Sequence, residues 1–167
     1  MIERRFNANA GVSAVHLGDG VRSNSATKIA GYAAVFNSEF VLYEDEGYRV
    51  VEIIQPGAFT PVLQDDVRCL FNHAPDNVIG RTGNGTLTMR QDTRGLRFQN
   101  VMDTKTTVGA NVLQMVKRGD VTGCSFAFVV EDAEWSEATQ ADGRTVVTRT
   151  IKTLKFVWTE GCRLLPE

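Results

Sequence analysis

The sequence predicts a mainly β domain, a small β-barrel or sandwich with a flanking helix packed outside it. Short apolar segments of strand length recur between turn residues, and a single segment, 107–118, has clear helical periodicity. A chain of 167 residues is long enough for one domain with its own hydrophobic core. We assign that domain to residues 27–167. Residues 1–26, rich in Asn, Ala, Ser and Gly, are predicted to form a flexible N-terminal arm.

Composition excludes several classes of protein. The net charge of -2 at pH 7 gives no electrostatic reason to expect a nucleic acid or an anionic membrane as partner. No apolar run approaches the ~20 residues that span a bilayer. The three cysteines lack CxxC spacing, so neither a disulfide scaffold nor a structural metal site is expected, and no cofactor motif is present. We interpret the chain as cytosolic.

The predicted strands are short and bounded by turn residues. They cover 29–36, 48–54, 66–72, 86–90 and 96–101 before the helix, and 123–130, 144–151 and 154–158 after it. A short helical turn is predicted within 58–63. The polar residues 131–143 are interpreted as a hairpin loop.

The helix over 107–118 has recognisable ends as well as an apolar stripe. The stripe consists of Val108, Val112, Met115 and Val116. Thr106 suits the N-cap position, and Gly119 suits the residue just after the last turn.

One strand offers a candidate nucleophile. In 123–130 the large side chains, with Cys124 and Phe126 among them, alternate with small ones that include Ser125. We therefore predict Cys124 in the core and Ser125 on the opposite, small-residue face, where a substrate has room to approach. Ser125 is either a structural contact there or a nucleophile, and a nucleophile needs an adjacent base.

Two further residues stand at the ends of predicted strands. His73 follows the strand over 66–72 and precedes a turn, a common place for a functional side chain, although it also suits a simple strand end. Asp92 lies in the turn between 86–90 and 96–101, where aspartate usually makes local turn hydrogen bonds.

The order of short motifs resembles the prohead protease family of tailed bacteriophages over roughly residues 28–153. The motifs are GYAAVFN at 31–37, IQPGAF at 54–59, DVR at 66–68, FNH at 71–73, IGRT at 79–82, GTL at 85–87, Asp92 with GL at 95–96, RGD at 118–120 and GCSFAF at 123–128.

The resemblance implies a serine endopeptidase of the herpesvirus assemblin type, built on a small antiparallel β-barrel with flanking helices. Such enzymes act in the host cytoplasm inside the immature procapsid. They cut the major capsid protein precursor and its scaffold region, and often themselves; a homo-oligomer is left open.

The resemblance also implies roles for site residues. His73 and Ser125 correspond to the family's catalytic pair. Asp92 is our candidate for the group that orients His73, because it lies in a family-like segment; Glu131 and Asp132 are the alternatives. Backbone N–H groups near Ser125 are the default oxyanion donors.

The end of the chain departs from the family pattern. Relatives continue with a further strand, whereas here residues 156–167 differ, and a missing strand would leave a neighbouring edge unpaired. This motivates a second hypothesis: a non-catalytic capsid-assembly protein, a degenerate prophage copy that retains the protease fold.

Overall fold

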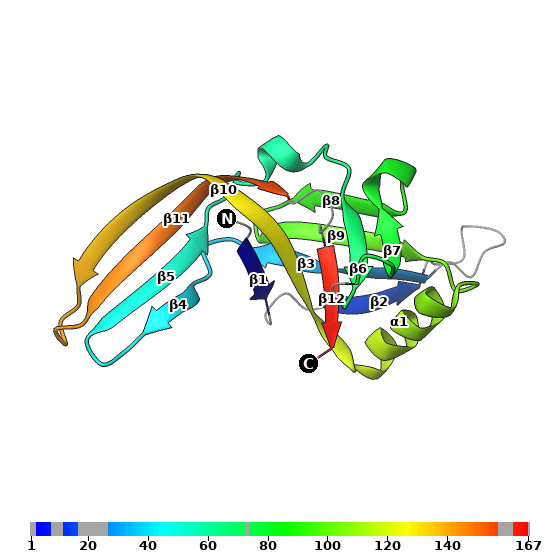
Figure 1. Cartoon of the computed structure of the whole chain (residues 1–167), viewed down its shortest axis with the longest axis horizontal. Coiled ribbons are helices and arrows are strands. Elements are labelled where there is room, and N and C mark those ends of the chain that lie inside the picture. The colour runs from blue at the N-terminus through cyan, green and yellow to red at the C-terminus, as the bar shows by residue number, and fades with distance from the viewer. Residues whose placement is uncertain (1–2, 8–11, 17–26, 73, 157–161, 167) are drawn as a thin grey trace.

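Two β-sheets and a helix make up the computed structural model, which describes residues 3–7, 12–16, 27–72, 74–156 and 162–166 (Figure 1). The strands are β1 (Glu3–Asn7), β2 (Val12–His16), β3 (Thr27–Val35), β4 (Phe40–Glu44), β5 (Tyr48–Ile54), β6 (Arg68–Phe71), β7 (Val78–Arg81), β8 (Leu87–Gln91), β9 (Gly95–Met102), β10 (Val121–Thr139), β11 (Thr145–Phe156) and β12 (Cys162–Pro166). The helices are α1 (Thr107–Arg118) and the short 3₁₀ turns η2 (Thr60–Val62) and η3 (Thr82–Asn84). A mainly β fold with a flanking α-helix is confirmed.

The larger sheet has the strand order β4-β5-β11-β10-β12-β6-β7, with β1 also paired to β10. The smaller sheet has the order β2-β3-β9-β8. Over the described residues this pairing gives two sheets and no closed barrel, so the barrel implied by the family resemblance is unconfirmed.

The core lies between the two sheets and is rich in aromatic rings. Phe126 of β10 packs edge-on against Phe59, with ring centroids 5.6 Å apart, and Phe98 of β9 is fully buried. A polar link also joins the sheets: the buried Asn100 of β9 donates a hydrogen bond of 2.8 Å from Nδ2 to the carbonyl of Ile79 in β7. Apolar burial and this hydrogen bond together hold the sheets face to face.

The helix prediction is confirmed at both ends. The Thr106 side chain accepts a hydrogen bond of 3.1 Å from the Gly109 N–H, which satisfies a donor of the first turn. Gly119 ends the helix in the left-handed region at φ 82, where a residue without Cβ is favoured. The signals that define this helix are all local in sequence.

Strands also lie where the sequence predicted none. β1 and β2 fall within the segment predicted to be a flexible N-terminal arm, where no strand was predicted. β12 pairs with both β10 and β6. The strand expected to be missing near the C-terminus is therefore present. These segments have weak periodicity of their own and are held by backbone pairing with distant strands.

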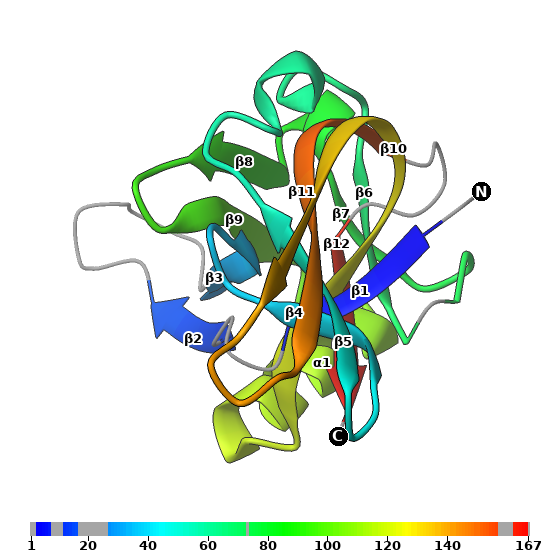
Figure 2. The same ribbon diagram turned by 90° about the vertical axis from the view of Figure 1, so that its left-hand side faces the viewer.

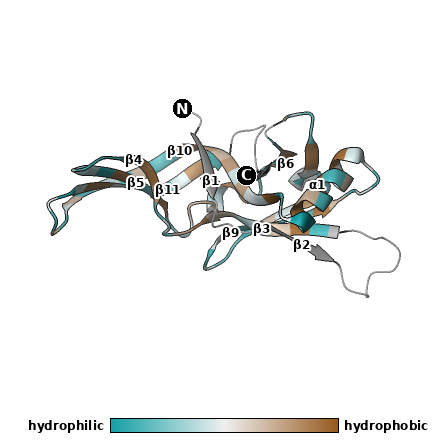
Figure 3. Ribbon diagram, turned by 90° about the horizontal axis from the view of Figure 1, so that it is seen from below, coloured by the Kyte–Doolittle hydropathy of each residue, from teal (hydrophilic) through white to brown (hydrophobic). Residues whose placement is uncertain are grey.

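The hairpin loop predicted at 131–143 was also wrong. β10 instead continues to Thr139, and β11 is one strand from Thr145 to Phe156, with a bulge near Asp132. With β4 and β5, these outer halves of β10 and β11 form a projecting sheet that extends away from the body (Figures 1 and 2). Figure 3 shows hydrophilic and hydrophobic residues mixed along it, which is why sequence periodicity revealed β5 and β11 but not β4 or the outer half of β10.

A buried ion pair lies across the middle of the projecting sheet. Glu52 is only 1 % exposed, and its Oε2 lies 3.1 Å from Arg149 Nη1. The Arg149 guanidinium lies 5.6 Å from the ring centroid of Trp135, its antiparallel neighbour in β10. Phe40 is the neighbour of Glu52 on the other side. The aromatic residues flank the ion pair. Because a buried charge requires an oppositely charged partner, the Glu52 carboxylate depends on Arg149.

Replacing Gly95 with alanine is expected to destabilise the protein. An added Cβ would lie 2.0 Å from the carbonyl oxygen of Ala34, a backbone atom that cannot rotate away. Since Gly95 pairs with Val35 at the junction of β3 and β9, the two strands would have to separate. We expect Gly95→Ala to lower the free energy of unfolding by about 2 kcal/mol or more, measured by urea denaturation. Gly47→Ala is the control: no atom lies within 4 Å of its added Cβ, so a change within about 0.5 kcal/mol is expected. Equal stability of both variants would contradict the close approach of β3 and β9.

Candidate functional site

Ser125 lies in β10, a strand with paired neighbours on both edges at this point. In the antiparallel register, Ser125 stands opposite Phe6 of β1 on one edge and Arg163 of β12 on the other. Because one residue pairs with only one strand per edge, β1 and β12 must flank β10 on opposite sides. Backbone pairing on both sides therefore fixes the position of Ser125.

The predicted alternation along this strand is confirmed. Cys124, Phe126 and Phe128 belong to the core cluster between the sheets, while Ser125 and Ala127 do not. Cys124 is fully buried, and its thiol contacts the Ser125 carbonyl at 3.6 Å. The opposite face is covered as well, since Ser125 is 2 % exposed. The sequence predicted small side chains on that face but not their burial.

His73 lies outside the described residues, so its predicted hydrogen bond to Ser125 stays a prediction. The strand that precedes it is described: β6 pairs in parallel with β12, and Leu70 stands opposite Arg163, which itself stands opposite Ser125. Two strand spacings separate Leu70 and Ser125, or about 10 Å between backbones. The strand that carries Ser125 and the strand that leads to His73 thus belong to one sheet.

Turn hydrogen bonds join Phe71, Ala74 and Asn77, the described residues on either side of position 73. The Phe71 N–H bonds to the Asn77 carbonyl at 3.0 Å, and the Asn77 N–H bonds to the Ala74 carbonyl at 2.9 Å. Asn72 takes a positive φ of 51, a conformation that asparagine tolerates better than most residues. The predicted strand end followed by a turn is therefore confirmed for the described residues.

Asp92 lies in the β8–β9 turn, and both of its carboxylate oxygens accept hydrogen bonds. Oδ1 accepts from the backbone N–H groups of Arg94 and Gly95 at 2.8 and 3.2 Å. Oδ2 accepts from the Tyr32 hydroxyl at 2.7 Å. The Tyr32 hydrogen bond, helped by the turn N–H groups, lowers the pKa of Asp92, so this carboxyl is ionised at neutral pH. Tyr32 is 60 residues away in sequence, and no local signal predicted the contact.

The two alternatives to Asp92 lie just beyond the Ser125 segment of β10. Glu131 forms an ion pair with Lys155 of β11. Both line a cavity of about 340 Å³ beside η2 and the start of β6, together with Asp66 and Arg68 among others. Asp132 is exposed at the bulge, opposite Thr153. The roles of Ser125, His73, Asp92, Glu131 and Asp132 stay predictions.

Among the described residues, no group of three or more His, Cys, Asp or Glu side chains is arranged to hold a metal ion. No helix in the described part of the chain is long and apolar enough to cross a membrane.

A serine hydrolase needs a base beside its nucleophile, and the strand that leads to His73 lies in the same sheet as Ser125. A family model described as caudovirus prohead serine protease matches residues 17–159 of the 167. The chain therefore belongs to the caudovirus prohead serine protease family, a family of serine peptidases, as the motifs predicted. Searches of curated proteins and of solved structures gave no match.

Proposed function

We propose that this protein is the serine endopeptidase that processes the major capsid protein precursor and its scaffold region during phage prohead maturation. The observation that carries the proposal is the place of Ser125 on β10, inside the matched family domain and in one sheet with the strand that leads to His73. The site of action is then the immature procapsid in the host cytoplasm.

In the proposed mechanism, Ser125 Oγ attacks the carbonyl carbon of the scissile peptide bond while His73 accepts the hydroxyl proton. The tetrahedral intermediate collapses, the C–N bond breaks, and His73 donates the proton to the leaving amine. Water then attacks the acyl-enzyme in the same way and releases the new carboxyl group. Asp92 is proposed to orient the imidazole, and backbone N–H groups near Ser125 to stabilise the oxyanion.

Self-cleavage is part of the proposal, and the position of β1 supports it. Residues Glu3–Asn7 lie antiparallel to β10, with Phe6 opposite Ser125. A segment of the chain's own N-terminus thus lies beside the proposed nucleophile in an extended conformation, the form in which peptides add to a strand edge.

The projecting sheet supports a protein partner. The described residues include seven large apolar side chains that are exposed, and six of them lie on this sheet: Phe40, Val41, Leu42, Tyr43, Tyr48 and Trp135. Exposed large apolar residues gathered on neighbouring strands are typical of a contact surface. We propose that capsid or scaffold chains contact the projecting sheet.

The non-catalytic alternative rested on a missing strand. β12 occupies the position between β10 and β6, so the unpaired edge that motivated this alternative is filled. We therefore favour the working protease.

A covalent probe tests the nucleophile directly. A small fluorophosphonate should phosphonylate Ser125 Oγ in the folded protein, with loss of fluoride and transfer of the hydroxyl proton to His73. We expect mass spectrometry to locate the adduct on Ser125, and heat-unfolded protein to remain unlabelled because the activating base is no longer adjacent. Ser136→Ala, which removes an exposed serine of the same strand, should label normally. Labelling of another serine, or none in the folded protein, would refute the assignment.

A further inference from the structure

We propose that the outer face of the smaller sheet binds the carboxylate groups of an acidic peptide segment through Arg90 and Arg97. The identification of that segment as part of the protein substrate rests on the proposed function; the binding site itself does not.

The first observation is the strand register. Arg90 of β8 stands directly opposite Arg97 of β9, so their side chains leave the same face of the sheet side by side. Like charges placed opposite each other destabilise a sheet. Within the described residues neither guanidinium has an ion pair, whereas Arg49, Arg81 and Arg149 each have a carboxylate partner. The arginine pair therefore has unused capacity for an anion.

A third guanidinium lies beside this pair. Tyr32 of β3 is the neighbour of Arg97 on its other side, and the Arg94 guanidinium lies 4.5 Å from the Tyr32 ring centroid. Asp92 adds one negative charge nearby: its oxygens accept hydrogen bonds from Tyr32 and from turn N–H groups, and the charge of Arg90 also helps to lower its pKa. Among the described residues, Arg90 and Arg97 outnumber the one carboxylate of Asp92 here, which leaves this part of the sheet locally positive.

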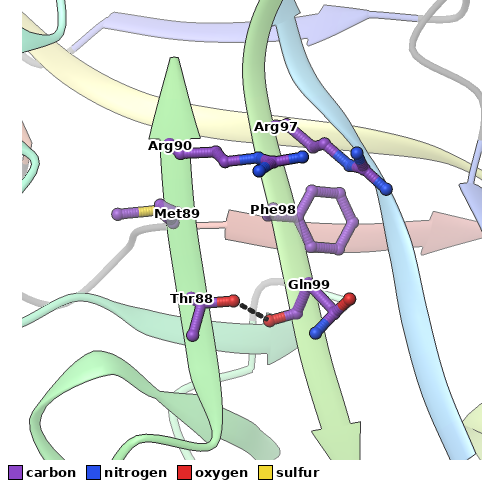
Figure 4. A pocket seen from close by; sticks show the side chains of 6 residues that line it. All are labelled: Thr88, Met89, Arg90, Arg97, Phe98 and Gln99. Atoms are coloured by element: carbon purple, nitrogen blue, oxygen red, sulfur yellow. Dashed lines mark hydrogen bonds between the residues drawn. The ribbon is translucent and has the colours of Figure 1, made fainter. Parts of the chain in front are cut away.

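The side chains around the arginine pair also enclose a cavity that a carboxylate can enter. A cavity of about 200 Å³ is lined by Thr88, Met89, Arg90, Arg97, Phe98 and Gln99. Figure 4 shows the Arg90 and Arg97 guanidinium groups extending in the same direction across the strands. Thr88 and Gln99 stand opposite each other in the register and add polar groups to the wall. A carboxylate entering here meets two cations and further hydrogen-bonding side chains.

The chemistry of the site favours an acidic peptide over a nucleic acid. Guanidinium groups bind carboxylates through paired N–H donors, and two such groups suit closely spaced Asp or Glu side chains. A nucleic acid would need an extended positive surface, but the chain carries a net charge of -2. It would also use an open aromatic face for stacking, and Arg94 already lies over Tyr32.

The test is a binding measurement by fluorescence anisotropy. The probe is a fluorescein-labelled decapeptide of alternating Glu and Gly, with a Gln–Gly peptide as its neutral counterpart. We expect the unmodified protein to bind the Glu peptide with an affinity that falls as salt rises, and to bind the Gln peptide at least about tenfold more weakly. The double variant R90Q/R97Q should lose at least about tenfold in affinity for the Glu peptide. It should unfold at the same temperature as the parent or higher, because like-charge repulsion is relieved.

A matched control removes two positive charges from another part of the protein. Lys105 and Lys117 are exposed residues outside the smaller sheet, and K105Q/K117Q should bind the Glu peptide as the parent does.

Equal binding by R90Q/R97Q and the parent would overturn the proposal, and so would a preference for an oligothymidylate over the Glu peptide. The outcome is independent of the proposed activity, because R90Q/R97Q should still be labelled by fluorophosphonate at Ser125. Failed labelling with intact arginine-dependent binding would refute only the protease.

Discussion

Ser125→Ala is expected to abolish processing of a co-expressed capsid precursor while the protein still folds. Loss of the nucleophile removes the covalent step, and in serine proteases this lowers turnover by about a millionfold. The substitution deletes one buried hydroxyl and leaves the alanine methyl in the same place, so the free energy of unfolding should change by only about 1 kcal/mol. Gel analysis of the precursor, and mass spectrometry of the protease for self-cleavage, measure the effect.

Cys124→Ala is the matched control for this experiment. Cys124 is the adjacent residue, but its side chain belongs to the core on the opposite face of β10. We expect its replacement to cost about 1–2 kcal/mol of stability through lost packing and to leave processing intact. Processing that survives Ser125→Ala and disappears with Cys124→Ala would reverse the assignment and make the thiol the nucleophile.

Asp92→Asn is expected to lower cleavage by about four orders of magnitude if the carboxylate orients His73 as proposed. An amide in place of the carboxylate favours the wrong imidazole tautomer, which is the reason for losses of this size in serine proteases. The low pKa of Asp92 suits the role, because an orienting carboxylate must be ionised at neutral pH. Cleavage rates on one capsid precursor, for variant and parent, give the measurement.

Tyr32→Phe separates that role from a structural one. It removes the hydroxyl that donates to Asp92 Oδ2 but leaves the carboxylate in place. We expect a loss of about 1 kcal/mol in stability and only a small change in cleavage. If Asp92→Asn behaves like Tyr32→Phe, Asp92 serves the β8–β9 turn, and the orienting role passes to Glu131 or Asp132.

The candidate site was predictable where its signals are local. Alternation of large and small residues along one strand is sufficient to place Cys124 in the core and Ser125 on the other face. Other features depend on distant contacts. The hydrogen bond from Tyr32 to Asp92 joins β3 to the β8–β9 turn, and the burial of Ser125 depends on what covers β10. Neither follows from the residues around Asp92 or Ser125.

Local sequence was sufficient for the α-helix, for the strands that bury one apolar face, and for membership of the protease family. The helix from Thr107 to Arg118 needs only its cap, its stripe and its terminal glycine, all within one short segment. The tertiary structure decided the rest: that 131–139 continues β10, that β12 fills the gap between β10 and β6, and that Arg90 stands opposite Arg97. The physical reason is that strands with polar side chains form by pairing backbone groups with partners far along the chain, and such pairing leaves no periodic signature in either partner alone.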